Sequence, residues 1–293
     1  MTMLNKKYVE LIESKLLEYF NGNDNKNELN KAMKYSLTLK GKRVRPLLLL
    51  EFCKACSGEV EKALPFACAI EMIHTYSLIH DDLPCMDNDD MRRGAKSNHK
   101  VFGEDMALLA GDALLNLAFE VMLSEENVKL LGESKVIAAS RTIAEAVGRK
   151  GMILGQVMDL KSENCNIPLS ELEKMHLNKT AKLISASCEA GCIVAGAKEN
   201  LVLSAKEYGQ KLGLAFQIMD DILDVTSTQK LLGKKPGSDL NNSKSTYVSL
   251  LGLEKSRKLV RDLTALAVKA LDEFEGEKEN FQQIAVELSN RIK

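Results

Sequence analysis

The chain has 293 residues, with 40 basic and 41 acidic side chains and a formal net charge of -1. This balance gives no bulk electrostatic attraction to nucleic acid, so we expect no nucleic-acid partner. Residues 1–20 mix acidic with apolar side chains and lack the apolar core of a secretory signal, and no apolar run approaches the length of a membrane span. The sequence therefore predicts a cytoplasmic protein without a membrane span.

Apolar residues recur at spacings of three and four along nearly the whole chain, and only 5 prolines and 18 glycines interrupt them. This pattern predicts an almost entirely α-helical protein, and no linker, repeat or low-complexity tract divides it. We therefore expect one helical domain over residues 1–293. The predicted helices cover residues 3–21, 27–38, 45–57, 62–83, 105–123, 127–147, 149–160, 169–195, 199–226, 243–252, 254–274 and 277–292.

The helix predicted over residues 62–83 is apolar around most of its circumference and ends in an acidic motif, DDLPCMD. Asp81 and Asp87 would point apart on a regular helix, but Pro84 favours ending the helix so that Asp87 can turn back. His74 lies seven residues before Asp81 and so faces the same end of the helix. For His74, a role as a satisfied core residue is an equal alternative.

The helix predicted over residues 199–226 carries a second acidic motif, DDILD. Asp220 and Asp224 are four residues apart and share a helix face, with Asp221 beside them. Carboxylates crowded at the ends of helices repel one another and meet the negative end of the helix dipole, so both motifs are expected to bind cations. Oxygen ligands without Cys or His favour Mg²⁺. The predicted metal ligands are Asp81, Asp82, Asp87, Asp220, Asp221 and Asp224.

Positive charge is concentrated in three short segments, GKRVRP at 41–46, RRG at 92–94 and GKK at 233–235. Arg offers a planar fork to phosphate oxygens, and Lys offers a point charge. Beside two acidic motifs that bind Mg²⁺, these segments predict a diphosphate site.

The seven cysteines lie in apolar helical segments, as is typical of reduced thiols in an intracellular chain. Cys53, Cys56, Cys68 and His74 could form a zinc site, but Cys53 and Cys56 lie in one continuous helix pattern without a Gly or Pro between them. The zinc interpretation is therefore disfavoured.

Together the motifs resemble the trans-isoprenyl (polyprenyl) diphosphate synthase family over nearly the whole chain, and they occur in the family's order. The segments that carry the resemblance are GKRVRP, EMIHTYSLIHDDLPCMDNDDMRRG, NHKVFGEDMALLAGDALL, GQVMDL, KTAKL, FQIMDDILD, GKKPGSD and KSTY. The two extra residues between Asp82 and Asp87 look like the bacterial short-chain type.

The resemblance implies an all-α isoprenoid synthase fold of ten or more helices around a central cavity, three Mg²⁺ ions and a homodimer. It implies the condensation of isopentenyl diphosphate with dimethylallyl or geranyl diphosphate to farnesyl diphosphate. In this family Asp81, Asp87 and Asp220 would hold the ions, supported by Asp82, Asp221 and Asp224. The allylic diphosphate would contact Arg92, Lys179 and Lys234. Isopentenyl diphosphate would contact Lys42, Arg45, His74 and Arg93, while Thr180 and Gln217 would line the reacting carbons.

Product length is expected to depend on Tyr76, five residues before Asp81, because the resemblance places its ring on the floor of the pocket. A geranylgeranyl diphosphate synthase is the near alternative, and a non-catalytic partner subunit is a more distant one. A terpene cyclase is disfavoured because only 5% of the residues are aromatic and there is no Trp. A di-iron helical bundle would need paired Glu-x-x-His motifs, which the sequence lacks.

Overall fold

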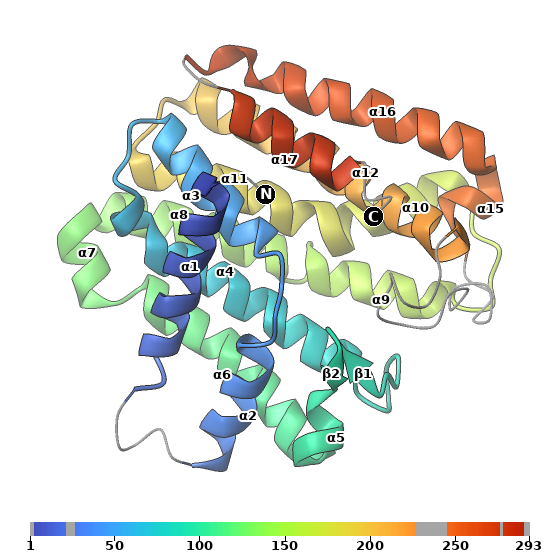
Figure 1. Ribbon diagram of the computed structural model, residues 1–293, viewed down its shortest axis with the longest axis horizontal. Helices are drawn as coiled ribbons and strands as arrows, with labels where there is room; N and C mark the ends of the chain where they lie inside the picture. The colour runs from blue at the N-terminus through green and yellow to red at the C-terminus, as the bar shows by residue number, and fades with distance from the viewer. Residues whose placement is uncertain (1–2, 22–26, 227–244, 276–277, 290–293) are drawn as a thin grey trace.

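The computed structural model describes residues 3–21, 27–226, 245–275 and 278–289, and helices make up most of them (Figure 1). The first half contains α1 (Met3–Glu18), α2 (Glu28–Leu37), α3 (Val44–Ala55), α4 (Val60–Asp81), α5 (Asn98–Phe102), α6 (Glu104–Met122), α7 (Glu125–Leu131) and α8 (Glu133–Val147). The second half contains α9 (Met152–Ser162), α10 (Leu169–His176), the π-helical turn η2 (Leu177–Ala181), α11 (Lys182–Ala195), α12 (Glu199–Thr226), α15 (Tyr247–Leu251), α16 (Leu253–Ala270), the 3₁₀ turn η3 (Leu271–Glu273) and α17 (Glu279–Ser289). The all-α prediction is confirmed, whereas the division into one domain stays a prediction.

Three details differ from the predicted elements. The helix expected over 127–147 is two helices, because Gly132 takes a φ of 86° that ends α7 before α8 begins. The helix expected over 169–195 contains η2, where the hydrogen bonding changes for five residues. A short hairpin of β1 (Met91–Arg92) and β2 (Ala95–Lys96) was not predicted, since two-residue strands carry no periodic signal.

Helix α4 runs through the middle of the molecule and packs against α6, α3 and α11 (Figure 1). Its side chains are buried on most of its circumference, among them Phe66, Ile70 and Ile73, as the continuous apolar sequence predicts. The main core surrounds α4, and a second, smaller apolar cluster joins α12 to α10, α15 and α16. Because α4 and α12 are largely buried, the acidic motifs at their C-terminal parts begin in the interior: Asp82, Asp221 and Asp224 are buried, whereas Asp87 is exposed.

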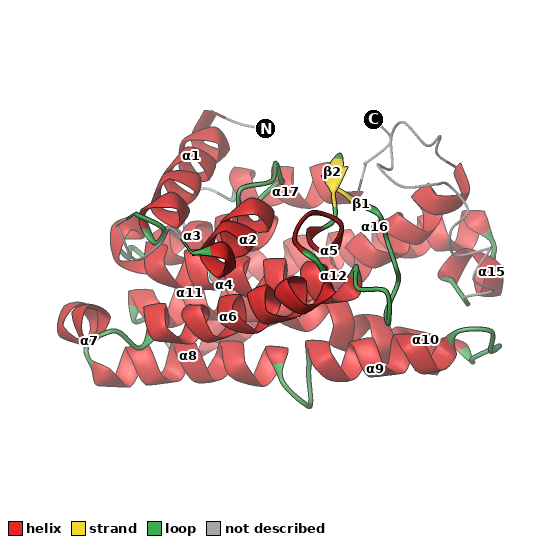
Figure 2. Cartoon of the chain, turned by 90° about the horizontal axis from the view of Figure 1, so that it is seen from below, coloured by secondary structure: helices red, strands yellow, loops and turns green. Residues whose placement is uncertain are grey.

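One helical stretch of the described chain, Glu104–Leu131, is long and apolar enough to cross a membrane by length and composition. It comprises α6 and α7, which Leu123 and Ser124 separate. Core helices of water-soluble proteins meet the same criterion, so the predicted absence of a membrane span stays a prediction. Figure 2 shows α6 above α8 and α9, which run along one edge of the molecule.

The contact between α3 and α11 depends on the missing side chain of Gly191. A Cβ atom built there lies 2.2 Å from the carbonyl oxygen of Leu49 and 3.0 Å from the Cβ of Phe52. Backbone atoms cannot move aside as a flexible side chain can, so the two helices must separate to accept even one methyl group.

We therefore expect Gly191→Ala to lower the free energy of unfolding by roughly 3 kcal/mol through overpacking. Gly148→Ala is the control, because its φ of -73° suits any residue and a Cβ built there meets only the Ala144 carbonyl oxygen, at 3.1 Å. The control should change the free energy of unfolding by no more than about 1 kcal/mol. Urea denaturation measures both values, and equal losses would contradict the packing explanation.

Candidate functional site

The first acidic motif folds back on the end of α4. The backbone amide of Asp87 donates a hydrogen bond of 2.9 Å to the carbonyl oxygen of Asp81, and the amide of Met86 donates one of 2.8 Å to Leu83. The helix ends at Asp81, three residues before Pro84. The predicted turn is therefore confirmed, and it places Asp81 and Asp87 next to each other despite their separation in sequence.

The Asp81 carboxylate lies in a crowded electrostatic environment. Burial raises the pKa of Asp81 to about 6, and the charges of Asp87 and Asp82 add to the rise while Lys179 and Arg92 oppose it. Asp87 itself is exposed. A cation bound between these carboxylates would relieve the repulsion that raises the pKa of Asp81.

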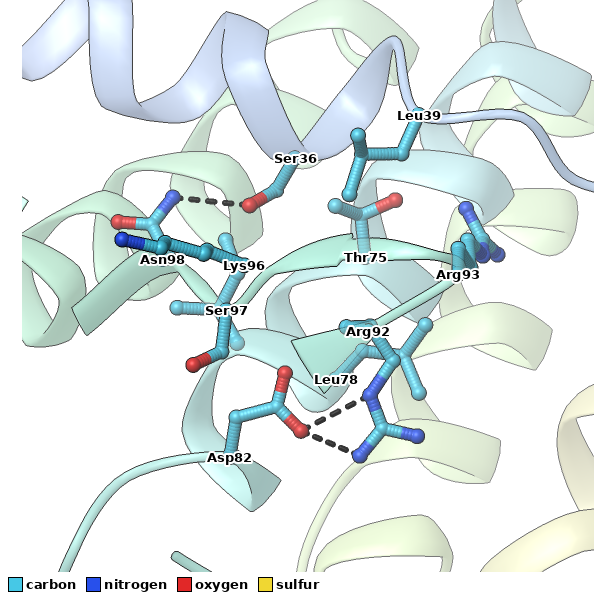
Figure 3. A pocket seen from close by; sticks show the side chains of 11 residues that line it. Ser36, Leu39, Thr75, Leu78, Asp82, Arg92, Arg93, Lys96, Ser97 and Asn98 are labelled. Carbon is cyan, nitrogen blue, oxygen red and sulfur yellow. Dashed lines mark hydrogen bonds and ion pairs between the residues drawn. The ribbon is translucent and has the colours of Figure 1, made fainter. Parts of the chain in front are cut away.

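Asp82 has a different role from its neighbour, because its side chain is 2% exposed and faces the hairpin (Figure 3). Its Oδ1 accepts a hydrogen bond of 2.8 Å from Arg92 Nε and a second from Arg92 Nη2. Arg92 Nη2 also lies 3.1 Å from Asp89 Oδ2. Asp82 therefore anchors Arg92, and this arrangement fits a supporting role better than direct metal binding.

Lys179 projects from the π-helical turn η2 toward the first acidic motif. Its Nζ lies 2.6 Å from Asp159 Oδ2 on α9. Burial lowers the pKa of Lys179, but the charges of Asp159 and Asp81 outweigh this effect, and the pKa is raised overall. A Cβ built on Gly155 would lie 2.2 Å from the backbone nitrogen of Lys179, so the glycine lets α9 approach this turn. The lysine is thus a half-buried, positively charged group beside the carboxylates.

The same turn contacts the helix of the second acidic motif. Thr180 Oγ1 donates a hydrogen bond of 2.9 Å to Gln217 Oε1 on α12, one helical turn before Asp220. Gln217 Nε2 is 3.5 Å from Asp221 Oδ1, and Asp221 Oδ2 accepts a hydrogen bond of 2.9 Å from the Tyr247 amide. Turn η2 therefore lies between the two acidic motifs, and Asp221 links α12 to α15.

The remaining members of the second motif differ in exposure. Asp220 is half-buried, whereas Asp224 is 4% exposed. Asp220 is thus the more accessible of the two. Their predicted roles as an ion ligand and its support stay predictions.

A cluster of positive charge surrounds the middle of α4. Arg93 comes from the hairpin, and its Nη2 lies 3.6 Å from Glu71 Oε1. Its Nη1 is buried without a hydrogen-bond partner among the described residues. Burial lowers the pKa of His74 well below its usual value, and the charges of Arg45 and Arg93 lower it further. His74 is therefore neutral near pH 7, and the cluster has positive charge available for an anion.

Arg93 and Arg92 line a small pocket between α2, α4 and the hairpin, in which Figure 3 also shows Thr75 and Asp82. Lys42 is exposed and Arg45 is half-buried at the start of α3. The residues predicted to bind diphosphate thus form two groups, one around Arg93 and His74 and one around Lys179. Lys234 lies outside the described residues.

Within the described ranges, no three His, Cys, Asp or Glu side chains form a cluster that could hold a metal ion on its own. The zinc site considered for Cys53, Cys56, Cys68 and His74 is therefore not formed, since all four lie in the described part of the chain.

Tyr76 is 5% exposed on α4, and its ring meets the His80 ring edge-on with the centroids 5.6 Å apart. The Tyr76 hydroxyl is buried without a hydrogen-bond partner among the described residues. His80 in turn contacts α6, because its Nε2 lies 3.0 Å from the Leu108 carbonyl oxygen. Tyr76 therefore packs against His80 on α4, one helical turn before it, and His80 contacts α6.

Glu71, Asp159 and Gly155 were not predicted as site residues, yet each contacts one or helps to position it. Gly155 and Asp159 are four residues apart in the GQVMDL segment and so share a helix face, which is a signal that could have paired them. Glu71 lies in the apolar segment that leads to Asp81, where a single acidic residue is conspicuous. Such a residue must have a positive partner, but the sequence does not indicate which.

The family model for polyprenyl synthetase matches residues 26–284. The chain belongs to the polyprenyl synthetase family. It is 48% identical over 254 residues to the large subunit 1 of the chloroplastic heterodimeric geranylgeranyl pyrophosphate synthase of Arabidopsis thaliana, covering 86% of this chain and 68% of that protein. It is 46% identical over 252 residues to the chloroplastic geranylgeranyl pyrophosphate synthase of Catharanthus roseus, covering 86% and 70%.

Solved structures of polyprenyl synthetases confirm the isoprenoid synthase fold. An FPP/GFPP synthase from Zymomonas mobilis superimposes with a TM-score of 0.86 at 36% identity, covering 98% of this chain and all of that one (100%). A geranyltransferase from Helicobacter pylori, solved with magnesium and isoprenyl diphosphate, gives a TM-score of 0.83 at 34% identity, covering 98% and 95%. The polyprenyl synthetase described here is accordingly a prenyltransferase of isoprenoid synthesis.

Proposed function

We propose that this polyprenyl synthetase condenses isopentenyl diphosphate with dimethylallyl and then geranyl diphosphate to give farnesyl diphosphate, with Mg²⁺ as its cofactor. The position of turn η2 carries this proposal. Lys179 on this turn interacts with Asp81 and Asp159, while the adjacent Thr180 is hydrogen-bonded to Gln217 on α12. One short turn thus interacts with Asp81 and Asp159 through Lys179 and contacts the helix of the second acidic motif through Thr180.

The first reaction step breaks the bond between the allylic carbon and oxygen, and the diphosphate leaves with the electron pair. Asp81, Asp87 and Asp220 would hold Mg²⁺, with Asp82, Asp221 and Asp224 in support, and the three ions expected from the family would neutralise the leaving group. Arg92 and Lys179 add positive charge there, with Lys234 as a further predicted contact. A unit charge about 4 Å away contributes roughly 4 kcal/mol at an effective dielectric constant near 20, and it contributes most as charge develops on the oxygen.

In the second step the double bond of isopentenyl diphosphate attacks the allylic cation and forms the new carbon–carbon bond. Loss of a proton to the departing diphosphate then restores a neutral hydrocarbon chain. Arg93 and His74, with Lys42 and Arg45, are proposed to bind the isopentenyl diphosphate. Thr180 and Gln217 are proposed to line the carbons, where their mutual hydrogen bond keeps a fixed polar group beside the cation.

The length of the product is proposed to depend on Tyr76. The ring is buried against His80, which α6 holds in turn, so the phenol cannot move aside easily. A rigid ring at this depth supports termination at fifteen carbons. The second candidate is geranylgeranyl diphosphate synthesis, which the names of the plant relatives favour.

The protein is further proposed to be a homodimer in a reducing compartment such as the cytoplasm. All seven cysteines are free. Neighbouring helices expose large apolar side chains that a second copy would cover, namely Leu108 and Leu109 on α6, Ile137 on α8 and Ile153 on α9 (Figure 2). This apolar face also accounts for the membrane-like composition of α6 without requiring a membrane.

The proposed function predicts that purified protein with isopentenyl and dimethylallyl diphosphates forms farnesyl diphosphate, and that a chelator abolishes the reaction until Mg²⁺ is restored. Asp81→Asn should lower kcat by about a hundredfold or more, because charge stabilisation of the leaving group is lost. Asp262→Asn, on the exposed face of α16, is the control and should keep the wild-type kcat. An inactive wild-type protein would instead support the non-catalytic subunit.

Replacing Tyr76 by Ala is expected to give products longer than fifteen carbons, because the floor of the pocket recedes. Tyr76→Phe keeps the ring and should still yield farnesyl diphosphate. Chromatography of the dephosphorylated products distinguishes the chain lengths. Geranylgeranyl diphosphate from the wild type would favour the second candidate, and an unchanged product from the Ala variant would remove Tyr76 from length control.

The proposed dimer predicts that Leu109→Glu gives a monomer, because burying an unpaired carboxylate in an apolar interface is costly. Leu203→Glu on α12 is the matched control, since Leu203 is 56% exposed and Leu109 is 53% exposed. Sedimentation velocity measures the mass of each variant. A dimeric Leu109→Glu variant would place the interface elsewhere.

A further inference from the structure

Glu71 is a buried carboxylate that the proposed chemistry does not use. It lies on α4, ten residues before Asp81, and is 1% exposed. Its Oε1 is 2.5 Å from Arg43 Nη1 and 3.6 Å from Arg93 Nη2. A single oxygen atom is therefore shared by two guanidinium groups that come from different segments, the loop before α3 and the hairpin.

Arg43 fixes the segment that carries Lys42 and Arg45. Besides Glu71, its guanidinium contacts Glu13 at 3.4 Å and donates hydrogen bonds to the carbonyl oxygens of Leu37 and Leu39 at 3.0 and 2.9 Å. Arg43 therefore ties the start of α3 to α1, α2 and α4. With its own hydrogen bonds made inside the protein, Arg43 serves structure and holds the segment that carries Lys42 and Arg45 in place.

Arg93 is held differently, and part of it remains available. Its Nη2 faces Glu71, whereas its Nη1 has no hydrogen-bond partner among the described residues. A Cβ built on Gly41 would lie 3.0 to 3.3 Å from the guanidinium atoms, so this glycine lets the group lie against the loop. The pocket in Figure 3 has Arg93 and Thr75 on its wall.

We propose that Glu71 is a positioning residue for the isopentenyl diphosphate site. Its carboxylate orients Arg93 and, through Arg43, the segment of Lys42 and Arg45. Arg93 Nη1 has no hydrogen-bond partner among the described residues, so part of the Arg93 guanidinium group remains available to the diphosphate. This inference rests on the proposed function, since it names a residue that prepares one of the two substrate sites.

Glu71→Gln distinguishes two possible roles of the Glu71 carboxylate, because they predict opposite changes in the affinity for an anion. Loss of a negative charge alone would strengthen binding of an anion, whereas loss of orientation would weaken it. If Glu71 positions Arg93, Glu71→Gln weakens binding of isopentenyl diphosphate by about tenfold or more, as expected when a charged hydrogen bond is removed. Binding of a non-ionisable thio analogue of the allylic diphosphate stays at the wild-type value, because Arg92 and Lys179 have other partners.

Isothermal titration calorimetry with each ligand separately measures both affinities without turnover. Glu51→Gln is the control for burial, because Glu51 is 3% exposed on α3 and its nearest polar partner is Asn280 at 3.5 Å. The control should bind both ligands as the wild type does. Circular dichroism and the thermal midpoint report whether Glu71→Gln folds. If it does not fold, Glu71→Asp keeps the charge, withdraws the carboxylate by one methylene group and should still weaken isopentenyl diphosphate binding selectively.

A double-mutant cycle with Arg93→Ala separates positioning from a general structural role. Once Arg93 is absent, Glu71→Gln should have less than about half of its effect on isopentenyl diphosphate binding, measured as the logarithm of the fold-change. The inference would be overturned if Glu71→Gln bound isopentenyl diphosphate more tightly, or if it weakened binding of both ligands equally. It would also be overturned if the fold-changes of Glu71→Gln and Arg93→Ala simply multiplied in the double variant. Failure of the wild type to bind isopentenyl diphosphate would overturn the proposed function instead.

Discussion

The hydrogen bond from the Asp87 amide to the Asp81 carbonyl oxygen reverses the chain at the end of α4, and the arrangement of the site depends on it. Without this reversal the chain would carry Asp87 away from Asp81 along the helix axis. With it, the following hairpin returns along α4, so Arg92 reaches Asp82 and Arg93 reaches Glu71. These two carboxylates are eleven residues apart, or about 16 Å along the helix. Neighbouring arginines therefore contact carboxylates on different turns of α4.

Charge near the site is paired but not neutralised. Lys179 forms an ion pair with Asp159 and also interacts with Asp81 and Asp87. Arg93 faces Glu71, which it shares with Arg43, while its Nη1 has no hydrogen-bond partner among the described residues. Around Asp81, burial and the neighbouring aspartates raise the pKa of the carboxyl group. Bound Mg²⁺ would offset the repulsion between the aspartates, and a diphosphate group would offset the positive charge of Arg93.

Much of this site could be predicted from the sequence, because helical periodicity identified α4 and α12, and Pro84 indicated the turn after Asp81. Other parts depend on tertiary contacts that no local pattern encodes. The π-helical turn η2 follows from the packing of Lys179 against Gly155, twenty-four residues away in sequence. Asp82 and Asp221 look like their neighbours in sequence, and only the positions of Arg92 and the Tyr247 amide show that both already have internal partners.

Arg43 and Arg93 have φ angles of 48° and 53°, in the left-handed region that side chains with a Cβ rarely occupy. Each such residue costs on the order of 1–3 kcal/mol. Glycine would avoid this cost at both positions, and Asn would reduce it. At Arg43 the ion pairs with Glu71 and Glu13 and the hydrogen bonds to Leu37 and Leu39 offset this cost, whereas Arg93 leaves its Nη1 without a hydrogen-bond partner among the described residues. Activity and heat resistance should accordingly compete at Arg93, and design methods that score only folding energy will replace it.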